Sequence, residues 1–187
     1  MSDFNVTVYA SSSQDIPARY FDVAEELGRG IAERGWRLVY GGGRGGLMGA
    51  ASRGARAAGG AVTGIILQKF IDMGAHCTET AEMTTVTDMR QRKRGLDEAG
   101  DAYVALPGGY GTFEELFEII SFKQLGFHDK PVVVLNAFSY YDDFLAMTDK
   151  AFGEGFISSE FEGLFDRATS AAEALAAIER ARQATGR

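Results

Sequence analysis

The sequence predicts an α/β fold in which a mostly parallel sheet is flanked by helices on both faces. Short, wholly apolar runs alternate with longer, helix-like segments along the chain. Strands of this kind, each separated by a helix, are typical of parallel sheets that are covered on both sides. In addition, two glycine clusters, at 41–49 (GGGRGGLMG) and 107–115 (PGGYGTFEE), directly follow apolar runs. They mark strand-to-helix junctions.

The elements of the first half follow from these patterns. They are a strand at 5–10, a helix at 17–34, a strand at 37–40, a helix at 45–58 and a strand at 61–67. The helix at 17–34 has an apolar face with helical spacing, formed by Phe21, Ala24, Leu27 and Ile31. Residues 68–82 have no clean period and predict a loop with a short helical turn.

The second half continues the alternation. Its predicted elements are a strand at 84–86, a helix at 88–99, a strand at 102–106, a helix at 112–125, a strand at 131–136, helices at 140–152 and 170–182, and a short strand near 164–168. The whole chain, 1–187, therefore predicts one Rossmann-like, doubly wound domain. In such sheets the ligand lies at the carboxyl ends of the strands, where both glycine clusters and the serines at 11–13 are expected.

Composition limits the classes of function. With 187 residues, 45% of them hydrophobic, the chain can bury one sizeable core. Its net charge of −7 argues against a general nucleic-acid or membrane-surface binder. Cys77 is the single cysteine, which excludes an internal disulfide and a CxxC site. No signal peptide is readable and no apolar run approaches the ~20 residues that span a bilayer, so a soluble, cytoplasmic protein is predicted.

The first glycine cluster suggests a phosphate site. Gly41, Gly43 and Gly46 satisfy the pattern G-x-G-x-x-G. The next strand ends in IILQK, without the acid that would hold a ribose hydroxyl, and the residues after Gly46 are not those of a Walker P-loop. What remains is a glycine-lined helix N-terminus that suits a phosphate, with Gly42 and Gly43 beside it. The alternative is that these glycines only permit tight packing of strand and helix.

The second cluster is more specific. Gly108, Gly109 and Gly111 let the backbone approach a ligand, and Thr112 is expected to open the following helix. The alternative is a capping box in which Glu115 reaches back to Thr112. A capping box, however, needs neither three preceding glycines nor a second acid, whereas a phosphate- or sugar-binding helix start explains both.

A basic island, 89–94 (MRQRKR), opens the helix that precedes the strand at 102–106, so it is expected beside the second cluster. Arginine is suited to bidentate recognition of phosphate or carboxylate, and the alternative is a solvated helix face. His76 and His128 have no neighbours at metal-ligand spacing, so neither a metal site nor a cofactor is predicted.

The helix at 112–125 and the residues after it are rich in large apolar side chains. They are Phe117, Ile120, Phe122, Leu125 and Phe127. This pattern predicts mostly core, with a dimer interface as the alternative.

Together, GGGRGGLMG, MRQRK and PGGYGTFEE resemble the LONELY GUY (LOG) family. Members of that family are phosphoribohydrolases that release cytokinin bases from their riboside 5′-monophosphates, and many were once labelled lysine decarboxylases. The resemblance runs from the first strand to about Ile157. It implies an AMP-type nucleotide substrate and a homodimer.

Carried over to matching positions, the resemblance implies the catalytic pair Arg92 and Glu115. It places further residues around the nucleotide: Lys93, Gly109, Tyr110, Gly111, Thr112, Phe113, Glu114 and Ser121. The glycine turns add Gly42, Gly43 and Gly108 as phosphate-binding candidates. Arg90 stands where the family usually has His, and YASSS follows the first strand where C-G-S-S is common, which leaves the preferred base open.

The resulting hypothesis is hydrolysis of an N-glycosidic bond. Glu115 is expected to activate water or stabilise a ribosyl cation, Glu114 to orient ribose hydroxyls, and Arg92 to hold the substrate. A sensor that binds a purine nucleotide without cleaving it is the alternative from another class. Lysine decarboxylation would need a Schiff-base lysine, for which isolated lysines such as Lys69 and Lys123 give no support.

Overall fold

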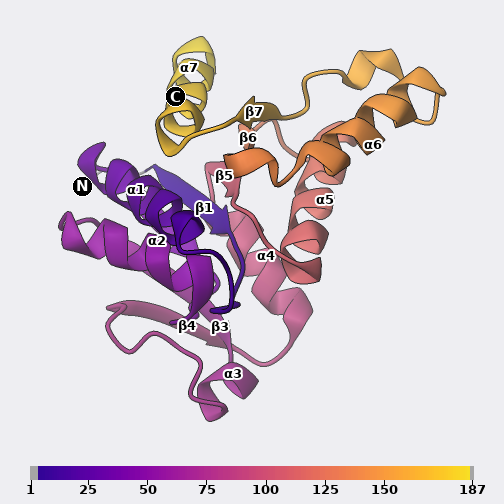
Figure 1. Ribbon diagram of the computed structural model, residues 1–187. Helices are drawn as coiled ribbons and strands as arrows, with labels where there is room; N and C mark the ends of the chain where they lie inside the picture. The colour runs from indigo at the N-terminus through magenta and orange to yellow at the C-terminus, as the bar shows by residue number, and fades with distance from the viewer. Residues whose placement is uncertain (1–3, 186–187) are drawn as a thin grey trace.

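The computed structural model describes residues 4–185, which form one domain around a seven-stranded sheet (Figure 1). The strands are β1 (Asn5–Tyr9), β2 (Arg37–Tyr40), β3 (Val62–Leu67), β4 (Glu82–Val86), β5 (Ala102–Ala105), β6 (Val132–Leu135) and β7 (Asp166–Ala168). The α-helices are α1 (Arg19–Glu33), α2 (Gly46–Ala57), α3 (Gln68–Asp72), α4 (Met89–Ala99), α5 (Tyr110–Gln124), α6 (Asp142–Gly153) and α7 (Ala171–Thr185). Short 3-10 helices cover Ala137–Ser139 and Ser159–Phe161. The ends of the predicted 1–187 domain, residues 1–3 and 186–187, lie outside the described residues.

The sheet is parallel at every strand pair and has the order β4-β3-β2-β1-β5-β6-β7. The strand order reverses at β1, which has β2 on one side and β5 on the other. A doubly wound sheet binds its ligand in the crevice at such a reversal, outside the carboxyl ends of the strands. The predicted α/β, Rossmann-like fold is confirmed.

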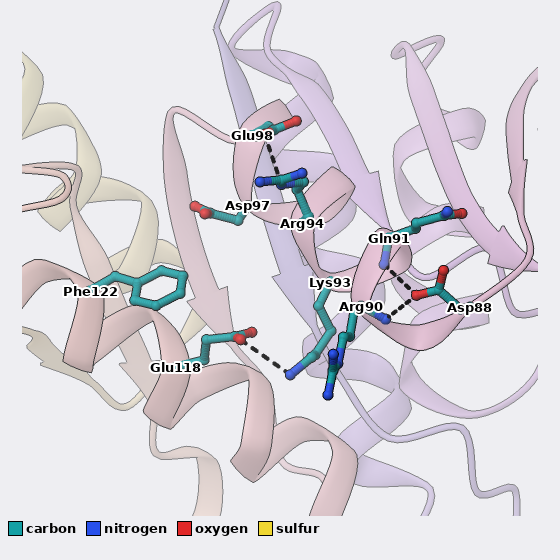
Figure 2. A pocket seen from close by; sticks show the side chains of 9 residues that line it. All are labelled: Asp88, Arg90, Gln91, Lys93, Arg94, Asp97, Glu98, Glu118 and Phe122. Carbon is teal, nitrogen blue, oxygen red and sulfur yellow. Dashed lines mark hydrogen bonds and ion pairs between the residues drawn. The ribbon is translucent and has the colours of Figure 1, made fainter.

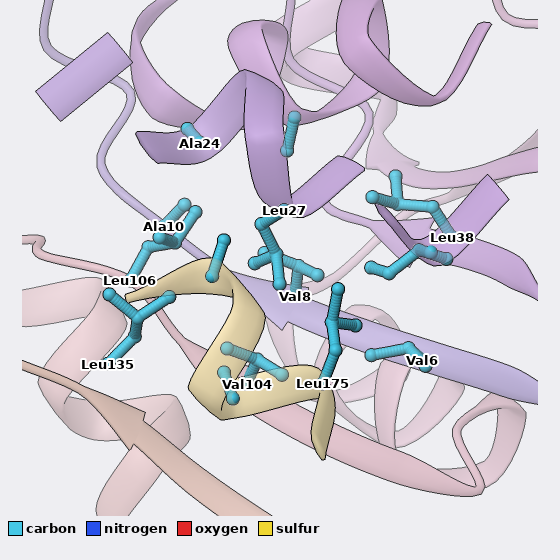
Figure 3. Packing of buried hydrophobic residues seen from close by; sticks show 14 of the residues in the cluster. Val6, Val8, Ala10, Ala24, Leu27, Leu38, Val104, Leu106, Leu135 and Leu175 are labelled. Carbon is cyan, nitrogen blue, oxygen red and sulfur yellow. The ribbon is translucent and has the colours of Figure 1, made fainter. Parts of the chain in front are cut away.

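Alternating strand residues supply two hydrophobic cores, one on each face of the sheet. Val6 and Val8 of β1 pack on the face covered by α1, α2 and α7, where Leu27 and Leu175 lie (Figure 3). Tyr9 points to the opposite face, covered by α4, α5 and α6. Figure 1 shows these two helical layers on either side of the strands. Because both faces are covered, central strands such as β5 and β6 are buried at every residue, whereas the edge strands β4 and β7 keep exposed polar residues.

The structure corrects one expectation about α5. The apolar pattern along this helix predicted mostly core, but its buried residues are Thr112, Leu116 and Ile119. Phe117, Leu125 and Phe127 are instead exposed, Phe127 by 73%. Spacing alone did not distinguish the core face because large apolar side chains occur on both sides of this helix.

Among residues 4–185, no helix is long and apolar enough to cross a membrane.

Candidate active site

A cleft of about 380 Å³ opens at the carboxyl ends of β1 and β5, where the strand order reverses. The segment after β1 lines one wall, with Ser11, Ser12 and Ser13. The start of α5 lines the opposite wall, and Arg92 and Glu115 also border the cleft. The two walls are joined by backbone hydrogen bonds, since the amide of Ser11 donates to the carbonyl of Pro107 at 3.2 Å. Segments far apart in the sequence are thus held together.

Arg92 and Glu115 form a buried ion pair in this cleft. A guanidinium nitrogen, Nη1 of Arg92, lies 3.2 Å from Oε1 of Glu115, and the two side chains are only 8% and 11% exposed. Removing one partner of a buried pair leaves an uncompensated charge, which costs about 3–5 kcal/mol. The pair therefore depends on both residues and on the geometry that brings α4 to α5.

Local sequence explains how Arg92 comes to be buried. The carboxylate of Asp88 caps α4 by accepting hydrogen bonds from the amides of Arg90 and Gln91, which fixes the start of the helix. Arg92 and Leu96, one turn apart, are the buried residues of α4. The first turn of the helix therefore turns Arg92 toward the sheet and the cleft.

Two backbone carbonyls complete the surroundings of Arg92. Its Nε donates to the carbonyl of Ile65 at 3.2 Å, and its Nη2 donates to that of Gly41 at 3.3 Å. A Cβ atom at Gly41 would lie 1.9 Å from Nη2, so any larger residue would displace the guanidinium. Arg92 thus braces the ends of β2 and β3 against α5. A lysine has one nitrogen and cannot make these three contacts in the same directions.

Burial sets the protonation of Glu115. Removal of its carboxyl from water raises the pKa of Glu115 to about 7, although Arg92 opposes this shift by stabilising the anion. The neighbouring carboxylate of Glu114 raises the pKa further, and Lys93 lowers it. Glu115 is therefore a carboxyl group whose charge changes near neutral pH, which suits a general base.

The start of α5 is free to meet an anion. The helix begins at Tyr110 with Gly109 as its N-cap, and no side chain caps it. The capping box considered for Thr112 and Glu115 is therefore wrong, because Thr112 lies inside the first turn and Glu115 pairs with Arg92 instead. Cβ atoms placed on Gly109 and Gly111 would meet nothing within 4 Å. Unpaired amides at a helix N-terminus with open space above them suit a phosphate.

Gly108 has a different role from the glycines that follow it. A Cβ atom on Gly108 would lie 2.1 Å from the hydroxyl oxygen of Thr112, so glycine is needed to let the first turn of α5 close over the end of β5. The carbonyl of Gly108 accepts a hydrogen bond from the hydroxyl of Tyr140. Gly108 therefore shapes the turn without lining the cleft.

A second compartment of about 350 Å³ adjoins the cleft beneath α3. The two share Ser12, Met48, Phe70 and Arg92 as lining residues. Ile66 and Met73 make the second compartment largely apolar, while Gln14 and Arg44 stand among its polar lining residues. Its roof is held by backbone contacts, since the amide of Arg44 donates to the carbonyl of Ala75 at 2.9 Å.

Most of the predicted site residues gather around this double cleft. Arg92, Glu115, Gly109, Tyr110, Gly111 and Thr112 line the first compartment, and Gly43 lines the second. Gly42, with φ +74°, packs against Ile66 and Met83, and its requirement for glycine follows from that conformation and packing.

Four other predicted residues lie away from both compartments. Phe113 packs its ring against Tyr141 in the core. Lys93 binds Glu114, and both lie at the neighbouring α4–α5 surface. Ser121 is exposed farther along α5.

The structure also brings in residues that the motifs did not single out. They are Met48 and Phe70, which lie at the junction of the two compartments. Met48 stands inside the first glycine cluster, so its sequence position gave a signal. Phe70 comes from the segment without clean periodicity, where only the fold shows that it faces the cleft. Within residues 4–185, neither compartment is lined by a lysine.

Comparison with known proteins shows the family to which the chain belongs. Residues 48–178 match a family model described as "Possible lysine decarboxylase". The chain is 41% identical over 174 residues to the cytokinin riboside 5′-monophosphate phosphoribohydrolase LOG of Oryza sativa subsp. japonica, covering 93% of this chain and 72% of the relative. It is 42% identical over 174 residues to the phosphoribohydrolase LOG3 of Arabidopsis thaliana, covering 93% and 81%.

Solved structures support the fold. The molybdenum cofactor carrier protein of Chlamydomonas reinhardtii superposes with a TM-score of 0.74 at 24% identity, covering 96% of this chain and 98% of that one. The molybdenum cofactor binding protein of Rippkaea orientalis gives a TM-score of 0.70 at 23% identity, with coverages of 95% and 94%. At this level of identity the likeness concerns the architecture of the sheet and its helices.

Proposed function

The chain belongs to the LOG family, and from that premise we propose that it hydrolyses the N-glycosidic bond of adenosine 5′-monophosphates, including N6-substituted ones. The products are the free base and ribose 5-phosphate. The observation that carries the proposal is the buried pair of Arg92 and Glu115, placed within one cleft beside an uncapped helix N-terminus. Glu115 supplies a carboxylate for the reaction, and the N-terminus of α5 supplies a binding site for the phosphate.

The 5′-phosphate binds at the start of α5. Gly109 and Gly111 leave room there, and the free amides with the positive end of the helix dipole attract an anion. Tyr110, which is 93% exposed, stands at the rim of the cleft. Binding of the phosphate, remote from the reacting bond, orients the ribose toward Glu115.

Glu115 acts on the ribose. As an anion it takes a proton from water while the water oxygen bonds to the anomeric carbon, and the bond from that carbon to the base breaks. The departing base keeps the electron pair and is protonated from solvent. The same carboxylate stabilises the positive charge that develops on the ribose, as carboxylates do in glycoside hydrolysis. Arg92 keeps Glu115 oriented and favours its ionised form.

The base extends into the second compartment. Phe70 and Met48 at the junction offer an apolar surface for the purine ring, and Ile66 and Met73 line the space beyond. An aliphatic N6 substituent would bury apolar surface there, which plain AMP cannot do. The compartment therefore supports a preference for N6-substituted nucleotides over AMP.

The two alternative functions, a lysine decarboxylase and a nucleotide sensor, require different residues in the cleft. A decarboxylase that uses a Schiff base requires a lysine beside the substrate, and the lining residues described here include none. A nucleotide sensor would use the N-terminus of α5 for the phosphate and the second compartment for the base. It would give no role to Glu115, a carboxyl group that titrates near neutral pH. Tight binding of AMP without release of adenine would favour the sensor.

The working form is a homodimer that associates through the outer stripe of α5. This stripe consists of Phe117, Ser121 and Leu125, spaced four residues apart on one helix face, together with Phe127. Exposed aromatic and aliphatic side chains in such a stripe mark an interaction surface. Association there would place Ser121, which lies outside the cleft of its own chain, at the interface with the partner subunit.

A further inference from the structure

The turn that leads from β5 into α5 is held at three successive carbonyl groups. The hydroxyl of Tyr141 donates to the carbonyl of Leu106 at 2.7 Å, and the hydroxyl of Tyr140 donates to the carbonyl of Gly108. The carbonyl between these two accepts a hydrogen bond from the amide of Ser11 at 3.2 Å. Because a peptide group is planar, each of these contacts fixes the direction of a whole peptide plane.

The last of these planes carries the amide of Gly109. The peptide between Gly108 and Gly109 is trans, so its carbonyl oxygen and its amide hydrogen point in opposite directions. Tyr140 holds the oxygen on one side, and the amide is therefore turned to the other. That other side is the cleft, because Gly109 lines it whereas Gly108 and Tyr140 do not. Among residues 4–185, no group of the chain accepts a hydrogen bond from this amide, which leaves it available to a ligand.

The segment after β6 has an unusual backbone. Phe138 and Ser139, with φ of 54° and 61°, are non-glycine residues in the left-handed region. Such conformations persist where the surroundings over-determine them, and they cluster at functional sites. Here the guanidinium carbon of Arg19 lies 4.5 Å from the centroid of the Phe138 ring, and Oδ1 of Asn136 accepts a hydrogen bond from the amide of Tyr141 at 2.7 Å. This held turn brings two adjacent tyrosines to the carbonyls before α5.

The other flank of α5 is held by side chains of α4. Figure 2 shows Lys93 reaching toward Glu118 across the hollow between the two helices, with its ammonium nitrogen 3.2 Å from Oε1. Arg92 pairs with Glu115 nearer the start of α5. These ion pairs hold the helix by its side chains, and they do not contact the backbone of the turn before it. The direction of the peptides in the turn is therefore set by the contacts of the turn itself.

We propose that Tyr140 is a positioning residue for the 5′-phosphate: by holding the carbonyl of Gly108, it turns the amide of Gly109 toward the anion. Tyr140 acts through the turn and does not itself meet the nucleotide. Partial burial raises the pKa of Tyr140, so its hydroxyl keeps its proton and remains a donor at neutral pH. The inference rests on the proposed function for the identity of the anion, whereas the direction of the amide exists without substrate.

The test uses Tyr140→Phe, which removes one hydroxyl and keeps the ring. Calorimetry measures its affinity for ribose 5-phosphate and for adenosine, which has no phosphate. Affinity for ribose 5-phosphate should fall by about fivefold, within the range that one hydrogen bond contributes, and affinity for adenosine should stay unchanged. Tyr20→Phe is the matched control, since the Tyr20 ring lies 6.1 Å from that of Tyr140 and, within residues 4–185, its hydroxyl makes no hydrogen bond to the turn.

A purely structural role for Tyr140 gives a different pattern. A lower melting temperature with both affinities unchanged, or an equal loss of affinity for both ligands, would overturn the proposal.

A second measurement needs no variant. In the 15N-labelled wild type, addition of ribose 5-phosphate should shift the backbone amide signal of Gly109, and an unmoved signal would overturn the proposal even if Tyr140→Phe does not fold. A wild type that does not bind ribose 5-phosphate would overturn it as well. If ribose 5-phosphate binds as expected but no nucleotide releases its base, the proposed hydrolysis is wrong and the role of Tyr140 stands.

Discussion

Nη1 of Arg92 and Oε1 of Glu115 lie 3.2 Å apart, although 23 positions separate the two residues in the chain. The contact joins the first turn of α4 to the second turn of α5, at the reversal of strand order. Burial disfavours the ionised form of Glu115, whereas the positive charge of Arg92 favours it. The balance raises the pKa of this carboxyl to about 7. A group balanced in this way responds to small changes in its surroundings.

The pH dependence of turnover follows from that balance. Because Glu115 acts as an anion and its pKa is raised to about 7, kcat/KM should increase with pH below about 7 and level off above it. Initial rates at saturating and limiting nucleotide, measured from pH 5 to 9 on a stable enzyme, check this expectation. A profile that is flat from pH 5 to 7 would remove Glu115 from the role of base.

Arg92→Lys tests whether the site needs the planar guanidinium group of Arg92 or only its positive charge. Lysine keeps the positive charge but cannot contact Glu115, Gly41 and Ile65 together, so kcat/KM should fall by about tenfold or more. Arg94→Lys is the matched control, since Arg94 is exposed and pairs with Glu98 at 3.4 Å on the outside of α4. Full activity of Arg92→Lys would reduce Arg92 to a general electrostatic role.

The base compartment predicts a change in selectivity. Phe70→Ala removes the aromatic wall at the junction of the two compartments, so the preference for isopentenyladenosine 5′-monophosphate over AMP should fall by about tenfold. Competition between the two nucleotides gives the ratio of kcat/KM values directly. Met147→Ala, an exposed change on α6, should leave the ratio as it is. An unchanged ratio in Phe70→Ala would place the N6 substituent elsewhere.

The outer stripe of α5 predicts the oligomeric state. Leu125→Glu puts a charge at the centre of an apolar surface, and the protein should become monomeric, as measured by sedimentation. Met147→Glu adds the same charge on α6 and should leave the dimer intact. A wild-type monomer at micromolar concentration, or a dimer that survives Leu125→Glu, would contradict the proposed interface.

Sequence reasoning reached the fold because the pattern was redundant. Apolar strands such as β6 (Val132–Leu135) and glycines after β2 and β5 all indicated the same parallel sheet. The closeness of Arg92 and Glu115 was inferred from motif order and resemblance, and the structure supplies the contact itself. The ends of helices were harder to predict from the sequence. Thr112 has the spacing of a capping box, but the backbone already turns into a helix at Tyr110.

What the sequence could not provide was the direction of side chains. Lys93 and Arg92 are adjacent, yet a turn of about 100° per residue sends one to the outer acids and the other to the cleft. Phe113 lies within the second glycine motif but points into the core, where its ring meets Tyr141. Phe70 had no periodic pattern around it, and only the path of the chain after β3 brings it over the cleft.

The most direct measurement is product analysis by chromatography after incubation with AMP and with isopentenyladenosine 5′-monophosphate. Wild type and Glu115→Gln are compared side by side, because glutamine keeps the size of the side chain and removes its charge. The account predicts free base and ribose 5-phosphate from the wild type, and a rate lower by about a hundredfold or more in Glu115→Gln. Equal rates in the two proteins, or bound nucleotide without any release of base, would contradict it.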